Sequence, residues 1–187
     1  MAEALVQKLK TIRSNFSVGL FSCCLLRRLK PEDVTKTDRV IIGEDGLYCI
    51  PTNKKVPPEA GNFYEVDFGG SPDFNIDRAA MEFTKMMLRN FTLDSFEAVR
   101  RYCDETGQRT KLLAQDWYQF TRMMRNSLTH TQTWHFRDYD RRELPVSWRG
   151  KTINESMEGQ ESDFDFYNWW DGCELWEEIN EFAKYLD

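Results

Sequence analysis

Histidine is scarce in this chain: only His130 and His135 occur among its 187 residues. The five cysteines include no Cys-x-x-Cys pair. Structural zinc sites are built from cysteine and histidine ligands at short spacings, so the sequence predicts no metal site, and nothing in it predicts a cofactor. Five cysteines without such a framework favour free thiols, and therefore a reducing, cytoplasmic location.

Long hydrophobic runs are also missing. The apolar stretch at residues 16–26 is too short to cross a bilayer, and it starts too far into the sequence to resemble a secretory signal. We therefore expect no membrane segment. The sequence contains no internal repeat and no low-complexity tract, and 41% of its residues are hydrophobic. This composition indicates a folded globular protein.

Charge is distributed unevenly along the chain. The net charge is −6, but residues 154–187 hold eleven acidic residues and one basic residue, and residues 1–153 carry a net charge of +4. A site for a polyanion is therefore expected outside the acidic carboxy-terminal segment.

Apolar residues at helical spacing dominate the sequence, which predicts a mainly α protein. At this length we expect a single domain, residues 1–187. Its expected parts are an amino-terminal helix within 1–30, an irregular or β insertion at 31–72 and a helical core at 73–187.

Two small β-hairpins are expected among the helices. One lies in RVIIGEDGLYCI (39–50), and the other lies in LPVSWRGKTI (144–153), with its turn at Arg149 and Gly150.

Turn and capping residues divide the helical core. Met81, Phe83 and Met87 predict one helix, and a second is expected to begin at Thr92 and end at Gly107. Asp171, followed by Glu174, predicts the start of the final helix.

The helix expected at about 116–131 has two chemically different faces. On a wheel of about 100° per residue, an apolar stripe forms on one side. Its members are Trp117, Phe120, Met124 and Leu128. The opposite face is polar and continuous, and consists of Arg122, Arg125, Asn126, Thr129 and His130.

These polar side chains suit metal-independent cleavage of RNA, in which the ribose 2′-OH attacks the neighbouring phosphate. Histidine can exchange protons near neutral pH, and the guanidinium of arginine matches phosphate oxygens. One histidine does not easily act as both the proton acceptor and the proton donor. A two-fold dimer that brings two such helices together would supply a pair.

The segment RNSLTH (125–130) resembles the R-(polar)-x-x-x-H signature of the HEPN superfamily, in which asparagine often follows the arginine. The surrounding WYQFTRMMRNSLTHTQTWHFRDYDRRELPVSWRGKTI is similar to plasmid- and phage-associated HEPN proteins of bacteria. The likeness extends over about residues 77–187. Some HEPN toxins carry a tyrosine two residues after the histidine, but this chain has Gln132 there.

The resemblance implies a HEPN-like helical bundle that forms a homodimer and acts as a toxin or defence ribonuclease on an RNA substrate. It implies that Arg125 and His130 are catalytic and that Asn126 assists them. Two alternatives are a non-catalytic RNA- or nucleotide-binding module and a protein-interaction subunit, for which an antitoxin or another protein would be the partner.

Further residues near the motif are candidates for binding RNA. Arg122 and Thr129 share its helix face, and the segment RDYDRR that follows could grip flanking phosphates through Arg137, Arg141 and Arg142. A solvated loop of mixed charge is the alternative for that segment.

Two aromatic segments have structural interpretations. His135 is expected to be half-buried beside its aromatic neighbours. DFDFYNWWDG (163–172) combines acidic and aromatic residues. We expect a loop fixed to the core by Trp169 and Trp170, and the alternative is a surface that docks on a basic partner.

Overall fold

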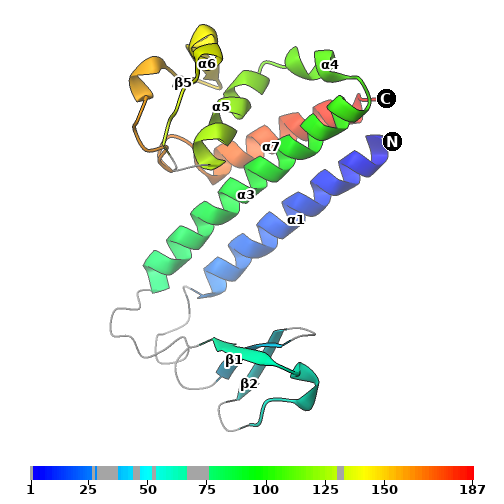
Figure 1. Ribbon diagram of the computed structural model, residues 1–187, viewed down its shortest axis with the longest axis vertical. Helices are drawn as coiled ribbons and strands as arrows, with labels where there is room; N and C mark the ends of the chain where they lie inside the picture. The colour runs from blue at the N-terminus through cyan, green and yellow to red at the C-terminus, as the bar shows by residue number, and fades with distance from the viewer. Residues whose placement is uncertain are drawn as a thin grey trace. The chain divides into compact units, whose positions relative to one another are not determined.

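The computed structural model describes residues 2–26, 28, 38–43, 47–51, 54–66, 76–129 and 133–187. The described chain is mainly helical, as the sequence predicts (Figure 1). His130, the histidine of the motif, lies outside the described residues, and so does Gln132.

The chain divides into two compact units. Residues 1–20 and 84–187 form the first, which we call the helical unit. Residues 21–83 form the second, which we call the sheet unit.

The sheet unit contains a three-stranded antiparallel sheet in the order β2–β1–β3. Its strands are β1 (Asp38–Gly43), β2 (Leu47–Pro51) and β3 (Phe63–Val66), and a short 3-10 helix, η1 (Pro58–Ala60), precedes β3. The register pairs Ile41 with Tyr48 on one side and with Glu65 on the other. The hairpin predicted at 39–50 is confirmed, and a third strand extends it.

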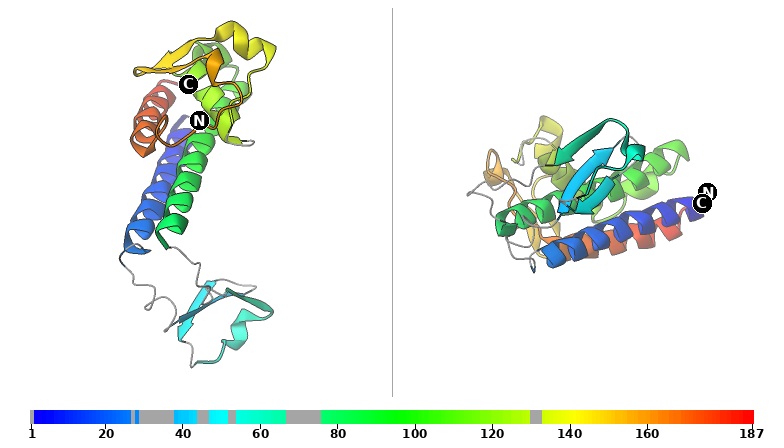
Figure 2. Two further views of the ribbon diagram at one scale, coloured as in Figure 1. Left: turned by 90° about the vertical axis from the view of Figure 1, so that its left-hand side faces the viewer. Right: turned by 90° about the horizontal axis from the view of Figure 1, so that it is seen from below.

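The helical unit contains most of α1 (Ala2–Leu26), most of α3 (Ile76–Glu105) and all of α7 (Trp169–Lys184), while residues 21–26 of α1 and 76–83 of α3 belong to the sheet unit. The three helices lie side by side in Figures 1 and 2. Phe16 of α1 stacks on Phe91 of α3 with ring centroids 4.3 Å apart. The indole N–H of Trp176 in α7 donates to the backbone oxygen of Leu9, at 3.1 Å. Buried apolar contacts and this hydrogen bond therefore hold the three helices together.

The expectation of two separate helices between residues 77 and 107 is wrong, because α3 continues through Thr92. This residue is buried, and its hydroxyl shares a hydrogen bond of 3.0 Å with the hydroxyl of Tyr167. A tertiary partner thus satisfies the threonine side chain inside the helix, where the sequence alone suggests a cap. The predicted end is confirmed, since α3 stops just before Gly107, whose φ is +70°.

Shorter elements follow α3. They are α4 (Arg109–Leu113), α5 (Tyr118–Thr129), α6 (Asp138–Glu143), β4 (Val146–Trp148), β5 (Lys151–Ile153) and η2 (Glu155–Met157). Strands β4 and β5 form the predicted hairpin. Its turn residues, Arg149 and Gly150, both have positive φ, which is the conformation of a tight hairpin turn that matches the strand twist.

The start of α7 differs from the expected cap. Asn168 is the N-cap, and its side chain accepts hydrogen bonds from the backbone N–H groups of Trp170 and Asp171. Asp171, predicted as the cap, lies three residues further on and accepts from the backbone N–H of Asn168 at 2.8 Å. The two side chains form a reciprocal capping box that fixes the first turn of the helix.

The apolar face of α5 lies in an aromatic cluster. Phe120 is fully buried, with ring centroids 5.2 Å from Trp148 and 6.2 Å from Phe166. Trp117 and Met124 are buried as predicted. Losing such a buried aromatic ring costs about 3–5 kcal/mol, so this packing sets the rotation of α5 about its axis.

Candidate functional site

A groove of about 380 Å³ lies in the helical unit. Side chains of α3, α4, α5 and α6 line it, and we call it the arginine groove. Its cationic residues are Arg100, Arg109, Arg122 and Arg125, and they are joined by Glu97, Asn126 and Tyr139.

Helix α5 contributes the motif residues to this groove. Because Phe120 and Met124 are held in the core, the opposite face of the helix turns Arg122, Arg125 and Asn126 toward the groove. These three side chains are half-buried. The packing of the apolar face therefore positions the polar one.

Arg125 is held by two neighbours. Its Nε donates to Oε1 of Glu97 at 3.0 Å, and its Nη1 donates to Oδ1 of Asn126 at 3.1 Å. The adjacent asparagine thus orients the guanidinium through its amide oxygen. Thr129, predicted to bind RNA, instead donates its hydroxyl to the backbone oxygen of Arg125 and does not line the groove.

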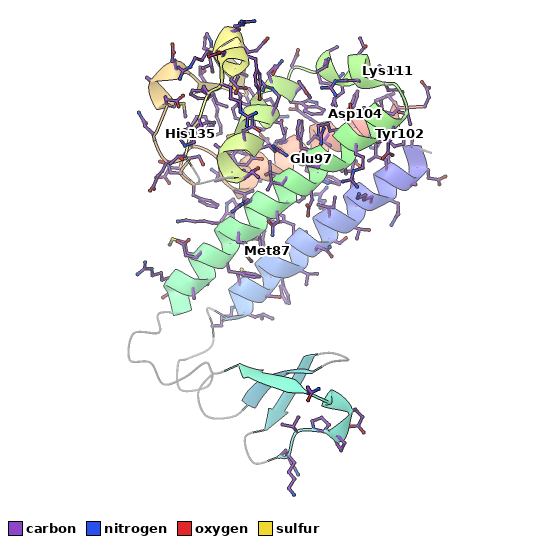
Figure 3. All side chains as sticks on the ribbon, in the orientation of Figure 1. Met87, Glu97, Tyr102, Asp104, Lys111 and His135 are labelled. Atoms are coloured by element: carbon purple, nitrogen blue, oxygen red, sulfur yellow. The ribbon has the colours of Figure 1, made fainter. Side chains whose placement is uncertain are left out.

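Glu97 connects two arginines across the groove. Its Oε2 accepts from Nε and Nη2 of Arg100, at 3.0 and 2.6 Å, while Oε1 accepts from Arg125. The hydrogen bond to Glu97 raises the pKa of Arg100 above its ordinary value. Asp104, further along α3 (Figure 3), bonds Arg100 and Arg109 at 3.3 and 2.7 Å.

The side chain of Arg122 is held mainly by contacts within the protein. Its side chain is 15% exposed and pairs with Asp140, whose side chain is 2% exposed. Its Nε donates to Oε1 of Gln119 at 2.8 Å, and its guanidinium lies 5.0 Å from the ring centroid of Tyr139. This pair joins α5 to α6 below the groove surface.

The charges in and beside the groove leave a small positive excess. The four arginines contact three carboxylates, those of Glu97, Asp104 and Asp140. A guanidinium carries more N–H donors than one carboxylate uses, so each arginine can still bind an anion. A phosphate would compete directly with Glu97 for Arg125.

The arginines predicted after the motif do not join the groove. Arg141 forms ion pairs with Glu155 and Glu158, and Arg137 and Arg142 are exposed. None of the three lines the arginine groove. These ion pairs and exposures fit the solvated segment of mixed charge that was the alternative, although the segment is the helix α6 and not a loop.

The expectation of a half-buried His135 is wrong. Its side chain is 62% exposed, and Nδ1 lies 3.6 Å from Oε1 of Glu158. Trp134 and Phe136, on either side of it, are buried. In an extended segment successive side chains point to opposite sides, so burial of both neighbours turns the imidazole outward.

The thiols of the buried Cys103 and the half-buried Cys173 suit packing rather than nucleophilic chemistry. Burial raises the pKa of Cys103 to about 11, and it also raises the pKa of Cys173. Both thiols therefore stay protonated at neutral pH.

Two features are absent from the described residues. Among them, no cluster of three or more histidine, cysteine or acidic side chains is placed to hold a metal ion. Within the same part of the chain, no helix is both long and apolar enough to span a membrane.

Sequence reasoning missed several groove residues. Glu97 and Arg100 lie three apart on α3, a spacing that places them on one helical face and could have marked them as an ion pair. Arg109 and Tyr139 come from α4 and α6. Only the tertiary fold brings these helices to α5.

Comparison with known proteins gives no match: no family model fits the chain, and no curated protein or solved structure is significantly similar to it. The functional argument therefore depends on the chemistry of the groove and on the sequence of the motif.

Proposed function

We propose that this protein binds RNA through the arginine groove and cleaves it without a metal ion, as a toxin or defence ribonuclease of the HEPN type. The observation that carries the proposal is the meeting of Arg125 and Asn126 with three further arginines in one groove. A concentration of guanidinium groups matches the phosphates of a nucleic acid, because each can donate two parallel hydrogen bonds to phosphate oxygens.

The proposed reaction is an internal transfer at phosphorus. The ribose 2′-oxygen attacks the neighbouring phosphate, the bond to the 5′-oxygen breaks, and the products are a 2′,3′-cyclic phosphate and a 5′-hydroxyl. A proton must leave the 2′-OH and another must reach the departing 5′-oxygen. His130 is proposed to carry these protons, with Arg125 stabilising the charge that develops on phosphorus.

One His130 per chain accounts for one proton carrier, so the proposal includes a homodimer in which two motifs share a cleft. Each protomer would then supply one imidazole and one Arg125. Tyr139, half-exposed at the groove, offers a ring on which an unpaired base can stack.

The two histidines of the chain provide a matched test. A labelled single-stranded RNA is incubated with wild-type protein, His130→Ala or His135→Ala, in the presence of EDTA. Wild type and His135→Ala should release 2′,3′-cyclic phosphate ends, and His130→Ala should be slower by about a hundredfold or more. Equal cleavage by His130→Ala, or a strict requirement for a divalent metal, would refute the mechanism.

A second candidate is RNA binding without cleavage. The observation in its favour is that Arg100, Arg109 and Arg122 belong to no motif, so the groove can hold phosphates without the histidine. Under this alternative no variant yields cleavage products. RNA affinity would survive His130→Ala and would fall with Arg125→Ala.

A further inference from the structure

Two adjacent tryptophans at the start of α7 lie on the protein surface. Trp169 is 50% exposed and Trp170 is 69% exposed. The sequence-based expectation that they fix the loop 163–172 to the core is therefore wrong. Tyr167, which is buried, anchors this segment instead.

Acidic residues lie near the two indoles in the sequence, and local contacts hold this segment in place. The ring of Phe164 meets Trp169 edge to face, with centroids 6.2 Å apart. The capping box of Asn168 fixes the helical turn that carries both tryptophans. Glu161, Asp163 and Asp165 are exposed on the segment that leads into this turn. We call the set of Glu161, Asp163, Phe164, Asp165, Trp169 and Trp170 the tryptophan patch.

Cations lie near two of the three acidic side chains of the patch, since Lys85 and Arg89 line one pocket with Glu161 and Asp163. Among the described residues, Glu161, Asp163 and Asp165 form no ion pair. Two carboxylates on α7 differ: Glu177 pairs with Arg13, and Glu181 pairs with Lys184. The patch therefore presents three exposed carboxylates that no ion pair of the described residues holds.

We propose that the tryptophan patch is a docking surface for a separate protein that presents an arginine-bearing basic segment. Guanidinium groups stack on indole faces, and nearby carboxylates add ionic attraction. The chain itself uses such contacts, since Arg13 lies 4.5 Å from the ring centroid of Trp176 and Arg149 lies 5.6 Å from that of Trp148.

The charge of the patch selects this partner over others. Phosphates of nucleic acids and of anionic membranes would be repelled by the three carboxylates. The groove arginines of a second copy are poor sources of the cation, because all four already contact Glu97, Asp104 or Asp140. A second copy would have to present an exposed arginine such as Arg137 or Arg142, and sedimentation tests that outcome. A basic segment of another protein can use both features of the patch, because its arginines can stack on the indole rings and pair with the carboxylates.

The test uses the full chain and a short oligoarginine peptide as the probe, with oligoglutamate as the peptide control. Binding is measured by calorimetry and by quenching of tryptophan fluorescence. The double variant Trp169→Ala, Trp170→Ala should bind oligoarginine about tenfold more weakly than wild type, because it loses the stacking platform. Asp165→Asn should weaken binding by about threefold.

The matched control is Tyr185→Ala, which removes an aromatic ring that is 78% exposed at the other end of α7. It should bind oligoarginine like wild type. Circular dichroism and thermal melting should show that the double variant folds, since both tryptophans are exposed.

Three results would overturn the proposal. One is equal affinity of the double variant and wild type, and another is an equal loss in Tyr185→Ala, which would indicate unspecific attraction to an acidic protein. The third is a wild-type dimer that the double variant converts to a monomer in sedimentation, which would make the patch a contact between copies. RNA cleavage is a separate readout: it should persist in the double variant, and its absence in wild type would contradict only the proposed function.

Discussion

The arginine groove and the tryptophan patch lie in one helical unit but differ in whether their charged side chains have ion-pair partners. In the groove every arginine contacts a carboxylate of the chain, so most of the positive charge is neutralised internally and a ligand competes with existing partners. In the patch the carboxylates have no ion-pair partner among the described residues. Internal carboxylates thus hold the arginines of the groove in place, whereas no ion pair of the described residues holds the carboxylates of the patch.

The two sites are expected to differ in ligand specificity. An anion that binds Arg125 competes with Glu97 for the guanidinium, so weak or badly placed anions gain little. A cation at the patch breaks no internal pair. We therefore expect the groove to be selective and the patch to be more permissive.

The largest expected effect comes from the pair that holds the groove together. Asp140→Ala removes the partner of Arg122 and the acceptor of the backbone N–H of Arg137, which lies 3.0 Å away. Because this carboxylate is buried, its loss should lower the free energy of unfolding by about 3 kcal/mol in urea denaturation. Asp138→Ala, at an exposed position of the same helix, should change it by less than about 0.5 kcal/mol. Similar values for the two variants would mean that Asp140 is not structural.

The next prediction tests whether the two sites act independently, by measuring the binding of RNA and of oligoarginine to the same variants. With His130→Ala as the background, so that RNA stays intact, Arg125→Ala should weaken binding of single-stranded RNA about tenfold. The double variant of Trp169 and Trp170 should leave RNA affinity unchanged. Oligoarginine should show the reverse pattern in the same titrations. If both sets of variants weaken both ligands, the two surfaces do not act independently.

A smaller effect concerns the anchor of the segment that leads to the patch. Burial raises the pKa of Tyr167 above its ordinary value, while its hydroxyl keeps the bond to Thr92. Above about pH 10 the unfolded chain releases the phenolic proton and the folded chain retains it, so stability falls as pH rises. Tyr167→Phe should be less stable by about 1 kcal/mol at pH 7 and should lose less stability above pH 10. Parallel stability curves from pH 7 to 11 would contradict this account of Tyr167.

The smallest effect tests whether Glu97 restrains the groove. Glu97→Gln removes the carboxylate that competes for Arg125 but keeps an acceptor for it, so RNA affinity should rise about threefold in the His130→Ala background. Glu105→Gln, an exposed charge removal elsewhere on α3, is the control and should have less effect. A fall in affinity would instead make Glu97 a residue that positions Arg125 for binding.

Much of the architecture could be predicted from periodicity. The first helix, the hairpin at Arg149 and Gly150 and the core face of α5 with Phe120 follow from spacing and turn chemistry. Thr92 misled the prediction because its hydroxyl has a distant partner, Tyr167, that no local pattern reveals.

The candidate site was harder to predict for the same reason. Arg125 and Asn126 could be found because they lie in one short motif, whereas Glu97, Arg109 and Tyr139 reach the groove from three other helices. The exposure of Trp169 and Trp170 was also missed, because composition favours burial of tryptophan and cannot say which rings a fold leaves at its surface.

The most direct test of the central claim, that the arginine groove binds RNA phosphates, is the salt dependence of RNA affinity. In the His130→Ala background, the slope of log affinity against log salt is measured with and without Arg125→Ala, and Arg137→Ala serves as a control outside the groove. Each lost phosphate contact to a single strand should make the slope shallower by about 0.7. The account predicts that change for Arg125→Ala and no change for Arg137→Ala. An unchanged slope for Arg125→Ala would contradict it.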